Sequence, residues 1–127
     1  MADSPKRVLV VDDDADIIEP VQCALEEHGY EVLVAHDGSE ALKRIERDAP
    51  DLILLDMIMP RRSGFSVLDK LAAHRGRVPP IIMMSGGAEP RHRDYAEARG
   101  VTRFLSKPFE MSDLLEQVDS LLLTGTA

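Results

Sequence analysis

The sequence predicts an α/β protein built on one doubly wound, five-stranded parallel sheet with five helices. Five short apolar runs recur along the chain, and their starts lie 24, 20, 29 and 22 residues apart. The segments between them show helical periodicity, so strands and helices alternate as in βαβ units. The length of 127 residues suits one domain with one core.

The five apolar runs give the expected strands. They are Arg7–Val11, Glu31–Ala35, Asp51–Leu55, Pro80–Met84 and Thr102–Ser106. The first, third and fourth runs are continuously apolar, which is typical of strands that are covered on both faces.

A helical pattern follows each strand. The first carries Ile18, Val21, Leu25 and His28 on one stripe, and Pro20 inside it should kink that turn. The next three are Ser39–Arg47, Gly64–His74 and Pro90–Arg99, of which the last is the shortest and most polar. The clearest amphipathic helix follows Pro108 and carries Met111, Leu114, Leu115, Val118, Leu121 and Leu122.

Right-handed crossovers leave few topologies for such a sheet. We expect the flavodoxin-like strand order 2-1-3-4-5. Ligands of these sheets bind beyond the carboxyl ends of the strands, near the point where the strand order reverses. Polar residues directly after a strand are therefore the candidates for function, whereas most other polar residues should only solvate the surface.

Composition excludes several classes of function. A net charge of −8 and only 3 Phe, 2 Tyr and 0 Trp argue against a general nucleic-acid binder. The single cysteine, Cys23, excludes an internal disulfide framework and a multi-cysteine metal site. No apolar run approaches the ~18 residues of a membrane span, and the start carries no targeting segment. We therefore expect a cytoplasmic protein without membrane or nucleic-acid partners.

Acidic residues follow two strands that the predicted order makes neighbours. Asp12, Asp13 and Asp14 come after the first strand, and Asp56 comes after the third. Asp14 is expected to cap the next helix. Asp12, Asp13 and Asp56 should converge, and three carboxylates repel one another unless a cation lies among them. Because oxygen ligands without His or Cys suit a hard divalent ion, the sequence predicts a Mg²⁺ site.

A hydroxyl and an ammonium follow the next two strands. Ser85 comes after the fourth strand and Lys107 after the fifth. Singly each reads as a loop residue, but together they stand beside the carboxylates. A carboxylate nucleophile, Mg²⁺, a lysine and a hydroxyl form a set suited to moving a phosphoryl group. The Lys107–Pro108 bond is a candidate cis peptide, which would direct the ammonium inward.

Over residues 6–122 the chain resembles the receiver domain of two-component response regulators. The matching segments are VLVVDDD, DLILLDMIMPRRSGFSVL, PPIIMMS and FLSKPF, and the element Asp-x-x-Met-Pro-x-x-x-Gly at Asp56–Gly64 is the most specific. The resemblance implies a phosphorylatable switch rather than an enzyme. Its phosphoryl group would come from a cognate histidine kinase or histidine phosphotransferase.

The resemblance also implies roles for the acidic residues. Asp56 would be the phosphoacceptor. The Mg²⁺ ion would be bound by Asp13, Asp56 and the backbone carbonyl of Ile58, with Asp12 acting through water.

Three further residues would carry the response. By the same resemblance Lys107 would pair with the phosphoryl group, Ser85 would be the switch hydroxyl and Phe104 the switch aromatic. Residues 61–107 hold 10 basic and 4 acidic side chains, a local balance of +6 in an acidic protein. We expect a surface of the fourth helix, fifth strand and fifth helix to bind an acidic partner or a second copy. A merely solvated face is the alternative. The basic residues of this surface are Arg91, Arg93, Arg99 and Arg103.

Other interpretations stay open. The start at Met1 and the short tail after Leu123 favour a single-domain receiver, and a receiver cut from a larger regulator or hybrid histidine kinase is the alternative. A Mg²⁺-dependent phosphatase with an aspartyl-phosphate is less favoured, because its haloacid-dehalogenase form needs an Asp where Ile58 stands. A purely structural binding module would not need the intact polar set.

Overall fold

The computed structural model describes residues 5–57, 64–73, 79–85 and 90–122. The strands are β1 (Arg7–Val11), β2 (Glu31–Ala35), β3 (Leu52–Asp56), β4 (Ile81–Ser85) and β5 (Arg103–Ser106). The helices are α1 (Ala15–Glu27), α2 (Gly38–Asp48), α3 (Gly64–Ala72), α4 (Pro90–Ala98) and α5 (Met111–Leu122). The predicted alternation of strands and helices is confirmed. None of the helices in these ranges is long and apolar enough to cross a membrane.

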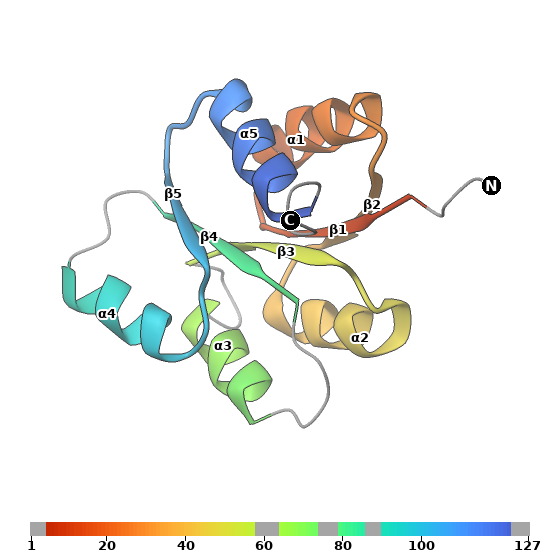
Figure 1. The fold of residues 1–127 in the computed structure, drawn as a ribbon. Coiled ribbons are helices and arrows are strands. Elements are labelled where there is room, and N and C mark those ends of the chain that lie inside the picture. The colour runs from red at the N-terminus through yellow and green to blue at the C-terminus, as the bar shows by residue number, and fades with distance from the viewer. Residues whose placement is uncertain (1–4, 58–63, 74–78, 86–89, 123–127) are drawn as a thin grey trace.

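The strands form one parallel sheet in the order β2-β1-β3-β4-β5 (Figure 1). Helices α1 and α5 cover one face of the sheet, and α2, α3 and α4 cover the other (Figure 1). This is the predicted flavodoxin-like order, in which the direction of winding reverses between β1 and β3. The carboxyl ends of these two strands therefore lie side by side.

Two apolar layers hold the helices on the sheet. Val10, Leu54 and Leu114 belong to the layer under α1 and α5, while Leu9 and Leu55 belong to the layer on the other face. Alternate residues of a strand point to opposite faces, so β3 and β4 contribute to both layers and are buried over their whole length. This double burial is the reason that they read as continuous apolar runs in the sequence.

The ends of α1 show which local predictions are correct. Asp14 accepts a hydrogen bond from the backbone N–H of Asp16 at 2.9 Å, as predicted for an N-cap. The helix runs through Pro20 without interruption. His28 caps the end of the helix, where its side chain is 44% exposed and pairs with Asp119 of α5.

Strands β3 and β4 begin and end one residue later than predicted. Asp56 and Ser85 are therefore the last residues of their strands instead of the first residues beyond them. The ladder extends this far because Asp56 lies opposite Met84 and Ser85 lies opposite Ser106. Lys107 directly follows β5, as predicted.

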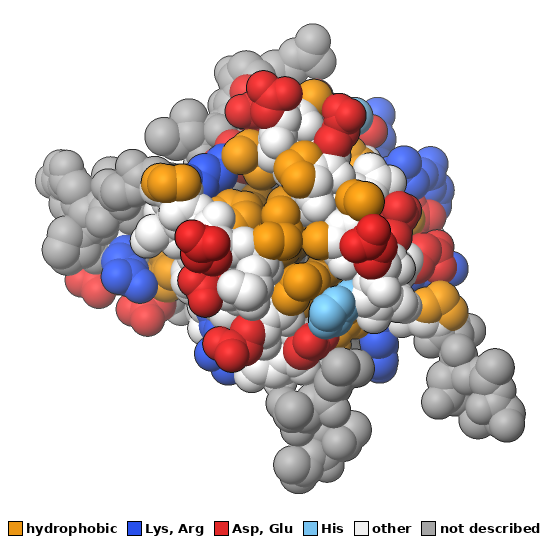
Figure 2. All heavy atoms as spheres, turned by 90° about the horizontal axis from the view of Figure 1, so that it is seen from above, with side chains coloured by type: hydrophobic (Ala, Val, Ile, Leu, Met, Phe, Trp, Pro, Cys, Tyr) orange, Lys and Arg blue, Asp and Glu red, His pale blue; other side chains and the backbone are white. Residues whose placement is uncertain are grey.

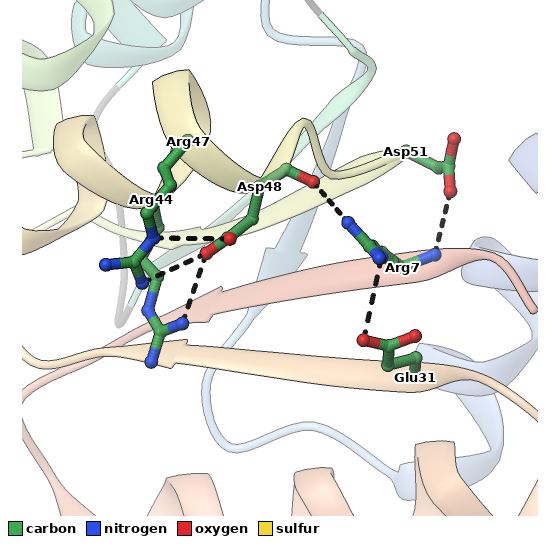
Figure 3. Close-up of polar contacts among 6 residues, drawn as sticks. All are labelled: Arg7, Glu31, Arg44, Arg47, Asp48 and Asp51. Carbon is green, nitrogen blue, oxygen red and sulfur yellow. Dashed lines mark hydrogen bonds and ion pairs between the residues drawn. The ribbon is translucent and has the colours of Figure 1, made fainter.

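A polar network closes the amino edge of the sheet, at the end opposite to these residues (Figure 3). Arg7 donates its backbone N–H to Asp51 and its guanidinium to the carbonyl of Asp48, both at 2.8 Å. The Nε of Arg7 also lies 3.5 Å from Glu31 on β2. The network ties the end of α2 to the first three strands. Its other members, which pair with Asp48, are Arg44 and Arg47.

Candidate functional site

Three carboxylates meet at the carboxyl edge of the sheet. Val11 lies opposite Leu55 in the register of β1 and β3, so Asp12, which directly follows β1, lies beside Asp56, the last residue of β3. Asp12 is completely buried, Asp56 is 6% exposed, and Asp13 is exposed. One oxygen from each of the three lies within 4.8 Å of the others. The structure thus brings together the acids that the sequence predicted to converge.

Lys107 offsets part of this negative charge. Its Nζ donates to Oδ2 of Asp12 at 3.1 Å and to Oδ1 of Asp56 at 3.2 Å. Burial alone would lower the pKa of Lys107, but the hydrogen bond to Asp12 and the charges of both carboxylates outweigh it, so the pKa is raised. Lys107 is therefore charged, and it holds the two buried carboxylates together.

Backbone contacts fix the elements that carry these side chains. The N–H of Met57 donates to the carbonyl of Met84 at 2.9 Å, and the N–H of Lys107 donates to the carbonyl of Ser85 at 2.6 Å. Oδ1 of Asp12 accepts the N–H of Asp14 at 3.0 Å. The Lys107–Pro108 peptide bond is cis, as the sequence analysis expected. The site is therefore attached to strand ends rather than to independent loops.

The acidic group fits a hard divalent cation. Asp12, Asp13 and Asp56 offer carboxylate oxygens only, and such ligands suit Mg²⁺ better than a transition metal that prefers imidazole or thiolate. The exposed carboxylate of Asp13 opens the group to solvent, which suits an ion that keeps several of its waters. The backbone carbonyl of Ile58, the remaining predicted ligand, lies outside the described residues.

Ser85 and Phe104 lie on the same face of the sheet. Met83 is opposite Phe104 and Ser85 is opposite Ser106 in the register of β4 and β5, and residues two apart on a strand share a face. Ser85 is 6% exposed. Phe104 is half-buried against the apolar layer beneath α2, α3 and α4. The predicted switch hydroxyl and switch aromatic are thus neighbours across two strands.

The predicted basic surface is divided by β5. The guanidinium of Arg93 on α4 stacks over Phe104, with its Cζ 4.7 Å from the ring centroid. Arg103 precedes Phe104 and so points to the other face of the strand, where it donates to Ser120 of α5 at 3.2 Å. The side chain of Arg91 lies outside the described part of the chain.

Arg99 is paired with an acid of the neighbouring helix. Its Nε donates to Asp69 of α3 at 2.5 Å, and its guanidinium lies 3.7 Å from the ring centroid of Tyr95. The hydroxyl of Tyr95 also donates to Asp69, at 2.9 Å. The hydrogen bond from Arg99 holds the pKa of Asp69 below its usual range. The charge of Arg99 is therefore largely balanced within the chain.

An apolar hollow beside Lys107 is a feature that the sequence analysis missed. It has a volume of about 190 Å³ and lies between α1 and the start of α5. Figure 2 looks down on these helices and shows hydrophobic side chains gathered on this face with acidic side chains around them. The available signal was Phe109 after Lys107–Pro108, together with two helices that contain no Lys or Arg. The hollow is lined by Asp16, Ile17, Pro20, Val21, Lys107, Pro108, Phe109 and Met111.

Comparison with known proteins assigns the chain to a family. Residues 8–119 match the model of the response regulator receiver domain. The chain is 35% identical over 117 residues to the alkaline phosphatase synthesis transcriptional regulatory protein PhoP of Bacillus subtilis, covering 92% of this chain and 48% of PhoP. It is 38% identical over 116 residues to the response regulator MprA of Mycobacterium tuberculosis, covering 91% of this chain and 50% of MprA. The chain thus spans about half the length of these relatives.

Solved structures show the same fold. The chemotaxis protein CheY4 of Vibrio cholerae superposes with a TM-score of 0.87 at 32% identity, covering 94% of this chain and 100% of CheY4. A CheY-like receiver domain protein of Methanospirillum hungatei gives 0.86 at 33% identity, covering 92% and 93% of the two chains. The strand order, the match over residues 8–119 and these relatives agree, and the chain belongs to the response regulator receiver domain family of two-component systems.

Proposed function

We propose that this domain is a phosphorylatable switch and that Asp56 is its phosphoacceptor. The observation that carries the proposal is the position of Asp56 at the end of β3, 3.2 Å from the ammonium of Lys107 and within the acidic group. The side chain of Asp12 is 1% exposed and that of Asp56 is 8% exposed. Asp56 is thus the more accessible of the two carboxylates that Lys107 contacts.

The proposed reaction moves a phosphoryl group from a phosphohistidine to Asp56. A carboxylate oxygen of Asp56 forms a new P–O bond while the P–N bond of the donor breaks, and the electron pair stays on the imidazole nitrogen. Lys107 offsets the charge of the phosphoryl oxygens during this transfer. The product is an acyl phosphate on Asp56 and a free histidine on the donor.

Asp12, Asp13 and Asp56 are proposed to hold Mg²⁺. When bound, the ion would supply positive charge that stabilises the phosphoryl oxygens. The protein itself keeps the carboxylates of Asp12 and Asp56 buried and paired with Lys107, and it leaves the carboxylate of Asp13 exposed to solvent.

A histidine kinase or a histidine phosphotransferase is the proposed donor, and we propose that it docks on the face of α1 and α5. A donor must contact the surface that adjoins Asp56, and the apolar hollow between these helices shares Lys107 with the site. A partner that buries this apolar lining would stabilise the complex through the hydrophobic effect. The acids around it favour a partner with basic residues at the rim.

Phosphorylation is proposed to change the opposite side of the site. The new group adds negative charge and acceptor oxygens near β4, and the Ser85 hydroxyl moves toward them. Phe104 then turns into the space behind β4. The surface of α4, β5 and α5, with Arg93 and Arg103 on the two sides of β5, would bind an acidic protein or a second copy. This proposal concerns the receiver domain itself, whatever further domain accompanies it.

Incubation with acetyl phosphate and Mg²⁺ tests the proposal. The wild type should take up one phosphate per chain, and Asp56→Asn should take up none. Asp14→Asn is the matched control, because Asn caps a helix as well as Asp and should leave labelling intact. Full labelling of Asp56→Asn would refute the assignment. Sustained turnover of an unrelated phosphoester would favour a phosphatase, and no labelling of the wild type would favour a structural module.

A further inference from the structure

The guanidinium of Arg93 covers the ring of the proposed switch aromatic. Its Cζ lies 4.7 Å from the centroid of Phe104, within the distance of about 6 Å at which a cation and an aromatic face attract. Arg93 is exposed and Phe104 is half-buried. The contact therefore lies at the boundary between the apolar layer and solvent, where a moving ring would break it.

The helix that carries Arg93 is anchored to α3 by a residue of its second half and by the residue directly after it. Tyr95 and Arg99 both donate to Asp69 of α3, at 2.9 and 2.5 Å. Ala96 is completely buried, whereas the other side chains at positions 93–98 are exposed. Arg93 lies one turn before this anchor. The guanidinium therefore approaches the ring from an anchored helix, and a Phe104 ring that turns inward moves away from it.

We propose that Arg93 acts as a latch: it holds Phe104 in its half-buried position and so sets the free energy that the site must supply to turn the ring inward. The inference rests on the proposed function and adds a regulatory residue to it. In the unphosphorylated domain the cation–ring contact favours the outward ring. When Phe104 turns inward the contact is lost, and Arg93 is released to solvent on the surface offered to an acidic partner. The contact between Arg93 and Phe104 therefore opposes activation. The guanidinium of Arg93 becomes available to a partner only when activation breaks this contact.

The size and sign of the effect follow from the contact. A cation–π pair at an exposed position shifts an equilibrium by a factor of about two to five. Removing it should tighten the binding of a phosphoryl mimic by that factor, because less free energy is spent on moving the ring. Loss of positive charge alone has the opposite sign, since it weakens the attraction of an anion. The direction of the change therefore separates a latch from simple electrostatics.

Titration with beryllofluoride in the presence of Mg²⁺, followed by NMR of the full chain, tests the latch. Arg93→Gln should lower the concentration at the midpoint about two- to fivefold. Arg47→Gln is the matched control, because it removes the same charge from an exposed position on α2 that pairs with Asp48 and lies over no ring among the described residues. In a Phe104→Leu background, Arg93→Gln should produce no further shift, since the partner of the guanidinium is already gone.

The outcomes separate the two levels of the proposal. A midpoint for Arg93→Gln that equals or exceeds the wild-type value overturns the latch and leaves the phosphoacceptor assignment standing. A full shift that persists in the Phe104→Leu background also overturns it, because the ring would then not be the group that Arg93 restrains. A wild type that binds no beryllofluoride overturns the proposed function, and the latch with it.

Discussion

Burial separates residues that look equivalent in the sequence. Asp12 and Asp13 are adjacent acids after one strand, yet Asp12 is completely buried and bridged by Lys107, whereas Asp13 is exposed. Removing Asp12 would leave Lys107 with a single buried partner. Removing Asp13 takes one negative charge from a like-charged group and leaves the buried pairing intact. The two residues should therefore respond differently to substitution.

We expect Asp13→Asn to weaken Mg²⁺ binding about tenfold or more. Without Mg²⁺ its free energy of unfolding should stay the same or rise by up to about 1 kcal/mol, because repulsion with the neighbouring carboxylates is relieved. Calorimetric Mg²⁺ titration and urea unfolding measure the two effects. Glu19→Gln, which removes the same charge from an exposed position on α1, should change neither. A wild-type Mg²⁺ affinity in Asp13→Asn would contradict the ligand assignment.

At the scale of helices and strands, local pattern predicted most of the fold. Buried parallel strands must be apolar on both faces, so three of the five strands were readable as continuous runs. The strand ends were less readable, because the extension of β3 to Asp56 depends on Met84, which lies opposite it on β4. The acids and Lys107 could be predicted as a group because the ends of parallel strands meet at one edge.

Contacts between helices could not be predicted in the same way. The pairing of Arg99 with Asp69 joins the residue directly after α4 to a residue of α3 that is 30 positions away, and it depends on how the two helices pack. The separation of Arg93 from Arg103 depends on which face of β5 each one approaches. A charge count along the chain contains neither kind of information.

The contact between α5 and Tyr30, which lies between α1 and β2, has a testable pH dependence. Tyr30 donates its hydroxyl to Asp119 of α5. Burial, together with this hydrogen bond, raises the pKa of Tyr30 above its ordinary value of about 10. The folded chain therefore keeps the proton at a pH at which the unfolded chain has lost it. The stability that this group contributes is complete below about pH 10 and is lost as the pH rises further.

We expect Tyr30→Phe to lower the free energy of unfolding at pH 7 by about 1–3 kcal/mol, since Asp119 loses a donor. Its stability should also fall less steeply above pH 10 than that of the wild type. Urea unfolding across this pH range, with phenolate absorbance as a second measurement, checks both statements. Tyr95→Phe is the control, because Tyr95 is 38% exposed and should cost less. Equal losses in the two variants would argue against the role of the Asp119 contact.

Substitutions on the face of α1 and α5 allow the docking of the donor to be tested separately from phosphoryl transfer to Asp56. Ile17→Asp places a charge in the apolar hollow and leaves the three carboxylates and Lys107 unsubstituted. It should slow phosphotransfer about tenfold or more with the histidine kinase that phosphorylates the wild type fastest in a panel. Labelling by acetyl phosphate should stay within about twofold of the wild type, because a small donor needs no docking surface. Gln22→Asp, at a half-buried position of α1 that is not part of the lining of the hollow, is the control. Equal slowing with both donors would place the defect in the site instead.

At the scale of the whole molecule, the site and the proposed partner surface share two strands. Ser85 ends β4, Phe104 lies within β5, and Lys107 directly follows β5. The backbone hydrogen bond from the N–H of Lys107 to the carbonyl of Ser85, at 2.6 Å, joins the ends of the two strands. These ends lie at the edge of the sheet where the proposed phosphorylation would add charge. A change at Asp56 is therefore expected to reach β4 and β5 first through Lys107, which contacts both Asp56 and Ser85. Lys107 is the residue at which uptake of phosphate and transmission of the signal should separate.

We expect Lys107→Ala to remain folded, to accept a phosphoryl group, and to fail in transmission. The free energy of unfolding should fall by about 2 kcal/mol, because Asp12 and Asp56 lose a shared, mostly buried cation. Added Mg²⁺ should restore more stability to the variant than to the wild type, since it replaces part of the missing charge.

Beryllofluoride should shift amide signals of the wild type from Asp56 to Phe104 and α4. In Lys107→Ala the shifts should stay close to Asp56, because the phosphoryl oxygens are no longer drawn toward β5. Lys43→Ala, an exposed change on α2, should behave like the wild type. Wild-type shifts at Phe104 in Lys107→Ala would show that the signal leaves the site by another path.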